Sequence, residues 1–155
     1  MLFRSQRILD GSHKDLRRGR AAAMSLIPTT TGAARAVSTV IPQVTGKLDG
    51  LAIRVPTPDG SITDLTVSVE KDVTIEEVNA AFKKAAETNM KGIMTYCDEP
   101  IVSIDTIGST VGCIYDSLLT MVIDKRLVKI FGWYDNEAGF TNQYLRLVKE
   151  VARKL

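Results

Sequence analysis

The chain has 155 residues, of which 45% are hydrophobic and 25% charged, a composition that fits one globular domain with a single core. Its 20 basic and 18 acidic residues leave a net charge of +2, too small to indicate nucleic-acid binding by bulk electrostatics. The sequence has neither an apolar leader nor a long apolar run, so it predicts a cytoplasmic protein without a membrane partner.

The first segment is rich in Arg, Gly and Ser and shows no strand alternation, so we predict a long ordered loop over residues 3–24. Only Asp10 and Asp15 offset its basic residues, which are Arg4, Arg7, Lys14, Arg17, Arg18 and Arg20. No aromatic side chain interrupts the stretch 4–20. This pattern favours a phosphate or carboxylate partner over stacked bases.

A helix is predicted after this loop. Thr31 and Gly32 resemble a helix start, and the helix formers of 33–41 continue to Pro42, which ends the pattern. Because backbone N–H groups are unpaired at a helix N-terminus, an anion is favoured at Thr31 and Gly32.

Two strands are predicted next, over 51–57 and 61–71, joined by a turn at 58–60. Their alternation and short connection predict a β-hairpin. Arg54 lies in the middle of the first strand, where a guanidinium is costly to bury unpaired. Its position leaves two interpretations open, a side chain on the solvent face or a ligand for an anion.

The rest of the chain is predicted to contain more strands and two helices. Thr74 and Glu77 have the spacing of a capping box before a helix over 75–88, and a second amphipathic helix follows over 139–155. The predicted strands cover 92–96, 101–104 and 111–114, followed by two within 120–135 around a turn at 124–126. The fold class is therefore α+β, a mixed, largely antiparallel sheet with helices on one face.

Asp135, Asn136 and Glu137 occupy the junction between the last predicted strand and the last helix, in the stretch GWYDNEAGFTNQ. One interpretation is helix capping by Asp135 or Asn136, with Glu137 at the positive end of the helix dipole. The other is ligand recognition, because the Asn136 amide carries both hydrogen-bond donors and an acceptor. The local sequence leaves both open.

Other catalytic chemistry has little support in the sequence. Cys97 and Cys113 are expected to be reduced thiols without an activating cation, and His13 is expected to be a surface or structural residue. The Cys and His residues lack the spacing of a zinc site. No G-x-G-x-x-G or G-x-x-x-x-G-K motif is present, so a dinucleotide-binding half is not expected within these residues.

Several stretches, in order, carry a family resemblance: HKDLRRGRAAA (13–23), IPTTTGAARAV (27–37), LAIRVPTPDGSITDLTV (51–67) and WYDNEAGF (133–140). From residue 6 to residue 155 the chain resembles the C-terminal catalytic domain of bacterial-type phosphorylating glyceraldehyde-3-phosphate dehydrogenase. Residues 1–5 (MLFRS) depart from the family pattern, and we expect them to be an unrelated leader joined to a truncated reading frame.

The resemblance implies a role for individual residues. The arginine-rich loop corresponds to the S-loop, which in the family lines the cofactor site at a subunit interface. Arg18 matches a phosphate-site arginine, Thr31 and Gly32 match the positions that hold inorganic phosphate, and Arg54 matches an arginine between the two phosphate sites. Asn136 matches the asparagine that binds the nicotinamide carboxamide of NAD.

The resemblance also implies an activity, the NAD-dependent oxidation and phosphorylation of glyceraldehyde 3-phosphate to 1,3-bisphosphoglycerate in glycolysis, by a homotetramer. In the family the catalytic Cys and His and the NAD-binding Rossmann domain precede the S-loop. We therefore expect no catalytic residue in this chain and no activity of the chain alone. Two alternatives remain open: an erythrose-4-phosphate dehydrogenase fragment, and a non-catalytic binding or assembly module.

Overall fold

The computed structural model describes residues 6–155, so the expected leader at 1–5 lies outside the described residues. The chain divides into two compact units, one ending at Pro58 and one running from Asp59 to Leu155. Among the described residues the buried apolar side chains are few: Ala22, Ile27, Met94, Tyr115 and Val128.

The first unit opens with the arginine-rich loop: residues 6–26 contain no helix or strand, which confirms the loop predicted over 3–24 for residues 6–24, while 3–5 lie outside the described residues. Its two legs are joined by backbone hydrogen bonds from Arg7 N to Arg18 O (3.2 Å) and from Gly11 N to Gly19 O (2.9 Å). A Cβ atom at Gly19 would lie only 2.7 Å from the Gly11 carbonyl oxygen. Glycine at this position therefore allows the two legs to approach closely.

The two strands of the first unit form a small antiparallel sheet. β1 (Ile27–Thr30) pairs with β2 (Leu51–Arg54), and α1 (Ala33–Val40) with the 3-10 turn η1 (Pro42–Val44) lies between them in the chain. The helix predicted from residue 33 is confirmed, and Pro42 follows its end as expected.

The predicted hairpin between 51–57 and 61–71 is wrong. β2 ends at Arg54 and pairs with β1, whereas β3 (Ser61–Ser68) pairs with β6 (Leu127–Tyr134) in the second unit. The physical reason lies in Pro56 and Pro58, which have no N–H to donate to a hairpin ladder. The distant strand β6 offers β3 an uninterrupted partner instead.

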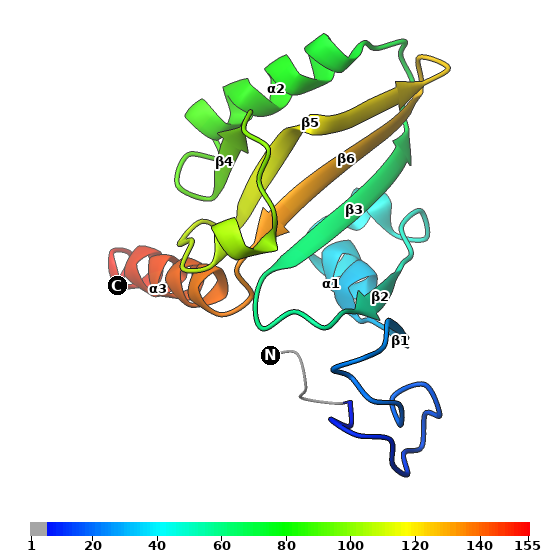
Figure 1. Ribbon diagram of the computed structural model, residues 1–155. Helices are drawn as coiled ribbons and strands as arrows, with labels where there is room; N and C mark the ends of the chain where they lie inside the picture. The colour runs from blue at the N-terminus through cyan, green and yellow to red at the C-terminus, as the bar shows by residue number, and fades with distance from the viewer. Residues whose placement is uncertain (1–5) are drawn as a thin grey trace. The chain divides into compact units, whose positions relative to one another are not determined.

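The second unit contains a four-stranded sheet in the order β3-β6-β5-β4, completed by β5 (Cys113–Ile123) and β4 (Met94–Cys97) (Figure 1). The β3–β6 and β6–β5 pairs are antiparallel and the β4–β5 pair is parallel. With three α-helices in the described residues, this arrangement confirms the predicted α+β class with a mixed, largely antiparallel sheet.

Residues 101–104 do not form the predicted strand. They lead into a 3-10 turn, η2 (Ser103–Thr106), with Thr106 fully buried. The Asp105 carboxylate accepts the Val102 N–H at 2.8 Å, and the Thr106 hydroxyl donates to the Ser103 carbonyl at 2.8 Å. These local side-chain bonds satisfy the backbone groups that a strand would need for its ladder.

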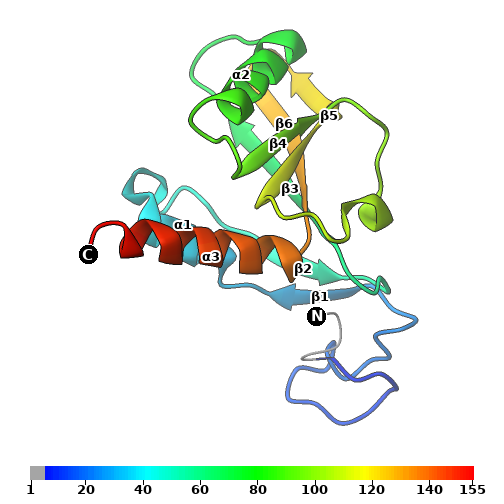
Figure 2. The ribbon, with the colours of Figure 1, turned by 90° about the vertical axis from the view of Figure 1, so that its left-hand side faces the viewer.

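The core of the second unit lies between the sheet and α2 (Ile75–Glu87), which runs along β4 and β5 (Figures 1 and 2). The Phe82 ring of α2 stacks on Tyr115 of β5 at a centroid distance of 4.1 Å. The Tyr115 hydroxyl bonds to Asn79 Oδ1 (2.7 Å) and to Thr120 Oγ1 (2.6 Å). A polar network therefore sits inside the aromatic core.

The predicted capping box at the start of α2 is confirmed. Thr74 Oγ1 accepts the Glu77 N–H at 3.2 Å, and the Glu77 carboxylate accepts the Thr74 N–H at 2.8 Å.

We expect Thr74→Ala to lower the free energy of unfolding of the second unit by about 1 kcal/mol, because one N–H of the first turn loses its acceptor. Urea unfolding measures the change, and Thr74→Ser, which keeps the hydroxyl, should recover most of it. If Thr74→Ala leaves the free energy of unfolding unchanged, the stabilising role of the capping box is contradicted.

The last helix, α3 (Ala138–Ala152), begins four residues after β6 and confirms the predicted C-terminal helix (Figure 2). A Cβ atom at Gly139 would lie 2.8 Å from the Val111 carbonyl oxygen, so the first turn of α3 lies tightly against that loop. The Gln143 amide donates to the carbonyls of Gly92 and Thr110, both at 3.1 Å. These contacts fix where the β6–α3 junction lies in the second unit.

Candidate functional site

Thr31 and Gly32 lie at the start of α1, as predicted. Thr31 Oγ1 accepts the Ala33 N–H at 3.2 Å, while Gly32 is the N-cap and has no side-chain capping bond. The first turn of α1 carries no acidic residue, and a Cβ atom at Gly32 would meet nothing within 4 Å. The helix start is therefore open, uncrowded and free of negative side chains, which suits an anion.

Arg54 lies at the other end of the β1–β2 ladder from this helix start. In the register Thr30 pairs with Leu51 and Ile27 pairs with Arg54. The two ends of the ladder are three residue steps apart, about 10 Å along the strands. Arg54 is exposed, and among the described residues its guanidinium has no acidic partner. The two features therefore suit two neighbouring anionic groups better than one shared group.

Arg18 occupies the second leg of the arginine-rich loop. Its Nε lies 3.4 Å from Asp15 Oδ2, within ion-pair distance, yet this contact lacks the geometry of a hydrogen bond and Nε is buried without another partner. The side chain is 24% exposed. The guanidinium of Arg18 is thus held near one carboxylate and keeps unused donors.

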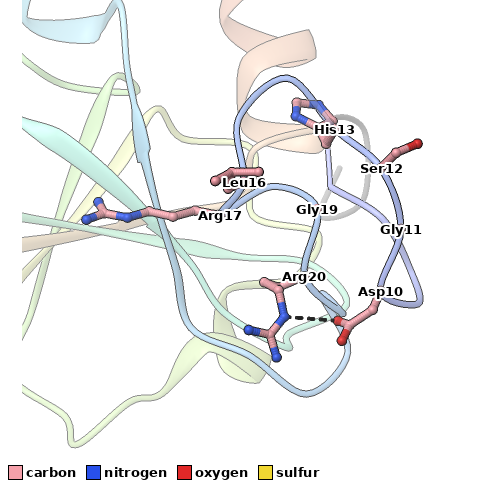
Figure 3. Close-up of a pocket in the computed structure, with 8 residues that line it drawn as sticks. All are labelled: Asp10, Gly11, Ser12, His13, Leu16, Arg17, Gly19 and Arg20. Atoms are coloured by element: carbon pink, nitrogen blue, oxygen red, sulfur yellow. Dashed lines mark hydrogen bonds and ion pairs between the residues drawn. The ribbon is translucent and has the colours of Figure 1, made fainter.

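The same loop surrounds an open hollow of about 580 Å³ (Figure 3). Across it Arg20 Nε contacts Asp10 Oδ1 at 3.2 Å. The pKa of Asp10 lies below its usual value, first because the Ala21 N–H donates to its carboxylate at 2.8 Å and then because of Arg20. The hollow is lined by loop residues alone: Asp10, Gly11, Ser12, His13, Leu16, Arg17, Gly19 and Arg20. None of the predicted phosphate residues lines it.

In the second unit, Asp135 caps the helix that follows β6. It is 2% exposed, and its Oδ1 accepts the N–H groups of Glu137 (2.8 Å) and Ala138 (2.7 Å). Its Oδ2 accepts the Gly108 N–H at 2.7 Å. Burial by itself raises the pKa of Asp135, but the hydrogen bonds outweigh burial and hold the pKa below its usual value.

Asn136 does not cap the helix, so of the two residues considered for capping only Asp135 accepts N–H groups at the start of α3. Its Oδ1 accepts the Ser61 hydroxyl at 3.2 Å, and its Nδ2 donates to Glu137 Oε1 at a long 3.4 Å. The side chain is half-buried. An amide has two acceptor lone pairs and two N–H donors, so one of each remains for a ligand. That remaining pair is complementary to a carboxamide.

Trp133 is fixed next to this junction by a contact that the sequence did not predict. Its indole Nε1–H donates to Asp116 Oδ2 at 2.9 Å, and Asp116 is 2% exposed. Ser61 and Gly108 were missed for the same reason, because their partners lie 75 and 27 positions away in the chain. Only the β3–β6 register, which no local pattern encodes, places Ser61 near Asn136.

Residues 6–155 contain no group of three or more His, Cys, Asp or Glu side chains that could hold a metal ion. Cys97 and Cys113 are free thiols, and burial raises the pKa of Cys113, which disfavours a reactive thiolate. Among the described helices, none has the length and apolarity needed to cross a membrane.

Comparison with known proteins identifies the family to which the chain is similar. The family described as the C-terminal domain of glyceraldehyde 3-phosphate dehydrogenase matches residues 2–136. Over 149 residues, 96% of the chain, it is 58% identical to glyceraldehyde-3-phosphate dehydrogenase of Geobacillus stearothermophilus and spans 44% of that protein. The Thermotoga maritima enzyme of the same name is 66% identical over 138 residues, which are 89% of this chain and 41% of that one.

A plant relative extends the comparison. Glyceraldehyde-3-phosphate dehydrogenase B, chloroplastic, of Pisum sativum is 54% identical over 150 residues, 96% of this chain and 33% of its own length. The chain thus spans less than half the length of each of these curated relatives. On the strength of the family match and these identities, the chain belongs to the glyceraldehyde 3-phosphate dehydrogenase C-terminal domain family.

Proposed function

We propose that the chain is part of an NAD-dependent, phosphorylating glyceraldehyde-3-phosphate dehydrogenase of glycolysis, a cytoplasmic homotetramer that converts glyceraldehyde 3-phosphate and inorganic phosphate to 1,3-bisphosphoglycerate. The chain contributes binding residues, while the catalytic Cys and His belong to a part of the enzyme that precedes the matched region. The family match supports the enzyme class, and the site geometry supports the individual roles.

The observation that carries the proposal is the free donor and acceptor of Asn136. NAD, when bound, supplies the acceptor for the substrate hydride. The part of this chain is to hold the cofactor's carboxamide in one orientation, with the remaining N–H of Asn136 facing its carbonyl and the remaining lone pair facing its NH2. Such an amide pair fixes the ring to which the carboxamide is attached, and orientation lowers the entropic part of the barrier.

Two groups of residues serve the anions in this proposal. Thr31 and Gly32 offer the open N-terminus of α1 to inorganic phosphate, assisted by Arg18 from the arginine-rich loop. Arg54 serves the neighbouring anionic group from the far end of the β1–β2 ladder. Arginine suits this role because its fork of donors matches the oxygens of a phosphate.

Phosphate titration of the 155-residue chain tests the anion sites. We expect inorganic phosphate to shift the backbone amide NMR signals of Thr31, Gly32 and Ala33 in a saturable manner. Arg18→Gln should weaken this binding about 5- to 10-fold, because one charge-assisted hydrogen bond contributes about 1–1.5 kcal/mol. Arg153→Gln, which changes an exposed arginine paired with Glu150, is the matched control and should have no effect. Equal affinities for the wild type and Arg18→Gln would contradict the role of Arg18.

The isolated chain should form no NADH from glyceraldehyde 3-phosphate, NAD and phosphate. Within the described residues neither Cys97 nor Cys113 has a cationic side chain or a histidine as a hydrogen-bond partner that could activate its thiol. Absorbance of NADH at saturating substrate measures the rate. A rate that survives purification and is abolished by Cys97→Ser or Cys113→Ser would show that the chain has a nucleophile of its own.

A further inference from the structure

The amide of Asn136 is held in one of its two possible orientations. A carboxylate can only accept hydrogen bonds, so the amide nitrogen of Asn136 must face Glu137 Oε1. The amide oxygen then faces Ser61, whose hydroxyl donates to it at 3.2 Å. The Ser61 hydroxyl is the partner that the structure gives to the amide oxygen, so it is the restraint on that end of the amide.

Ser61 is itself firmly placed. It is the first residue of β3 and pairs with Tyr134 at the end of β6. The preceding Gly60 is buried with φ of +85°, and a Cβ atom there would lie 2.9 Å from the Ser103 carbonyl oxygen. Only glycine fits this backbone without strain. The hydroxyl of Ser61 therefore projects from a strand end whose path is fixed by η2.

The backbone on the other side of the contact is equally constrained. Asp135 ties the residue before Asn136 to Gly108, just after η2, and also to the first turn of α3. Three chain segments, the start of β3, the η2 loop and the β6–α3 junction, are thus joined by direct hydrogen bonds and close packing. In this rigid frame the remaining freedom of Asn136 is rotation of its side chain.

We propose that Ser61 is a positioning residue, whose hydroxyl fixes the side-chain amide of Asn136 so that one lone pair and one N–H stay directed at the ligand. The identity of that ligand as a nicotinamide carboxamide rests on the proposed function. The positioning of the Asn136 amide by Ser61 does not rest on the proposed function, because it is a property of the ligand-free protein. Pre-orientation lowers the side-chain entropy that binding would otherwise have to remove.

The test compares Ser61→Thr with Ser61→Val in the 155-residue chain. These two side chains have nearly the same β-branched shape, which strands favour, and differ only in the hydroxyl. The readout is the 15N order parameter and chemical shift of the Asn136 side-chain NH2, assigned by its loss in Asn136→Ala. We expect an order parameter near that of rigid backbone, about 0.8, in the wild type and in Ser61→Thr, and below about 0.6 in Ser61→Val.

A control at the far end of the same strand, Ser68→Ala, should leave the Asn136 signals unchanged, since Ser68 pairs with Leu127 near the β5–β6 turn. The backbone signals of 59–155 verify the fold of each variant. Equal Asn136 order parameters in Ser61→Thr and Ser61→Val would overturn the positioning role, whatever the ligand. A low Asn136 order parameter in Ser61→Thr would also overturn the role, because a side chain that keeps the hydroxyl would then fail to hold the amide.

A separate experiment tests the proposed function. In a hybrid enzyme, this chain replaces the matched C-terminal region of the Geobacillus stearothermophilus relative, and NADH formation is measured. If Asn136→Ala leaves the KM for NAD and kcat of the hybrid unchanged, the carboxamide contact is wrong, while the ligand-free order parameters still decide the role of Ser61.

Discussion

Asp135→Ala is expected to lower the free energy of unfolding of the second unit by about 3 kcal/mol. The substitution removes the buried carboxylate that accepts the N–H groups of Gly108, Glu137 and Ala138. A hydrogen bond to a charged group contributes roughly 1.5–3 kcal/mol, and the three bonds of one carboxylate are not additive. Urea unfolding followed by the fluorescence of Trp133, the only tryptophan, reports on the second unit.

The matched control for this substitution is Asp98→Ala, since Asp98 is exposed and its side chain has no partner among the described residues. Its effect should stay within about 0.5 kcal/mol. A loss of the same size in both variants would mean that the fluorescence change reflects net charge rather than the cap.

Asp135→Asn separates charge from shape. The amide keeps an acceptor for Glu137 and Ala138 but turns N–H donors toward Gly108, so we expect a loss of about 2 kcal/mol. Because the folded-state pKa of Asp135 is lowered, its stabilisation is fully present above the unfolded pKa of about 3.9 and is lost as the pH falls through the folded value. The difference between wild type and Asp135→Asn should therefore be constant above about pH 5 and shrink below pH 4. A difference that grows on acidification would contradict the assignment.

Tyr115→Ala has the largest expected effect on stability, about 4 kcal/mol, because Tyr115 is 2% exposed and stacks on Phe82 at 4.1 Å. Replacing a buried aromatic ring with alanine removes its transfer free energy and leaves a cavity under α2, which typically costs about 3–5 kcal/mol. The same urea unfolding measures it. Tyr144→Ala, on the exposed face of α3 at 57% exposure, is the control and should change stability by less than about 1 kcal/mol.

Tyr115→Phe tests the polar part of this core. It keeps the stacked ring but removes the hydroxyl that bonds to Asn79 and Thr120, and we expect a loss of about 1 kcal/mol. Asn79 Oδ1 retains the Thr120 hydroxyl at 2.8 Å, which limits the cost. If Tyr115→Phe destabilises as much as Tyr115→Ala, the hydrogen bonds rather than the ring packing hold α2 to the sheet.

Elements with strong local signals could be predicted from the sequence. The capping box at Thr74 and Glu77 gave the start of α2, and Pro42 marked the end of α1. The β5–β6 turn was also predicted, and Asp124 and Lys125 both adopt positive φ there, 49° and 59°, as a tight hairpin turn requires. In each case the information lies within a few residues.

Features that depend on distant partners could not be predicted in this way. The choice of β6 rather than β2 as the neighbour of β3 depends on prolines and on a strand more than 50 positions away. The 3-10 turn η2 depends on hydrogen bonds between the Asp105 and Thr106 side chains and backbone groups three residues earlier in the chain. Ser61, the residue that contacts the predicted ligand-reading amide, has no local signal at all.

The most direct test of the account is NADH formation by the hybrid in which this chain replaces the matched region of the Geobacillus stearothermophilus relative. We predict activity with glyceraldehyde 3-phosphate, NAD and phosphate, and a fall of about 10- to 100-fold in kcat/KM on Asn136→Ala, equivalent to about 1.4–2.7 kcal/mol of lost orientation. A folded hybrid that forms no NADH, or one whose rate is unchanged by Asn136→Ala, would contradict the account.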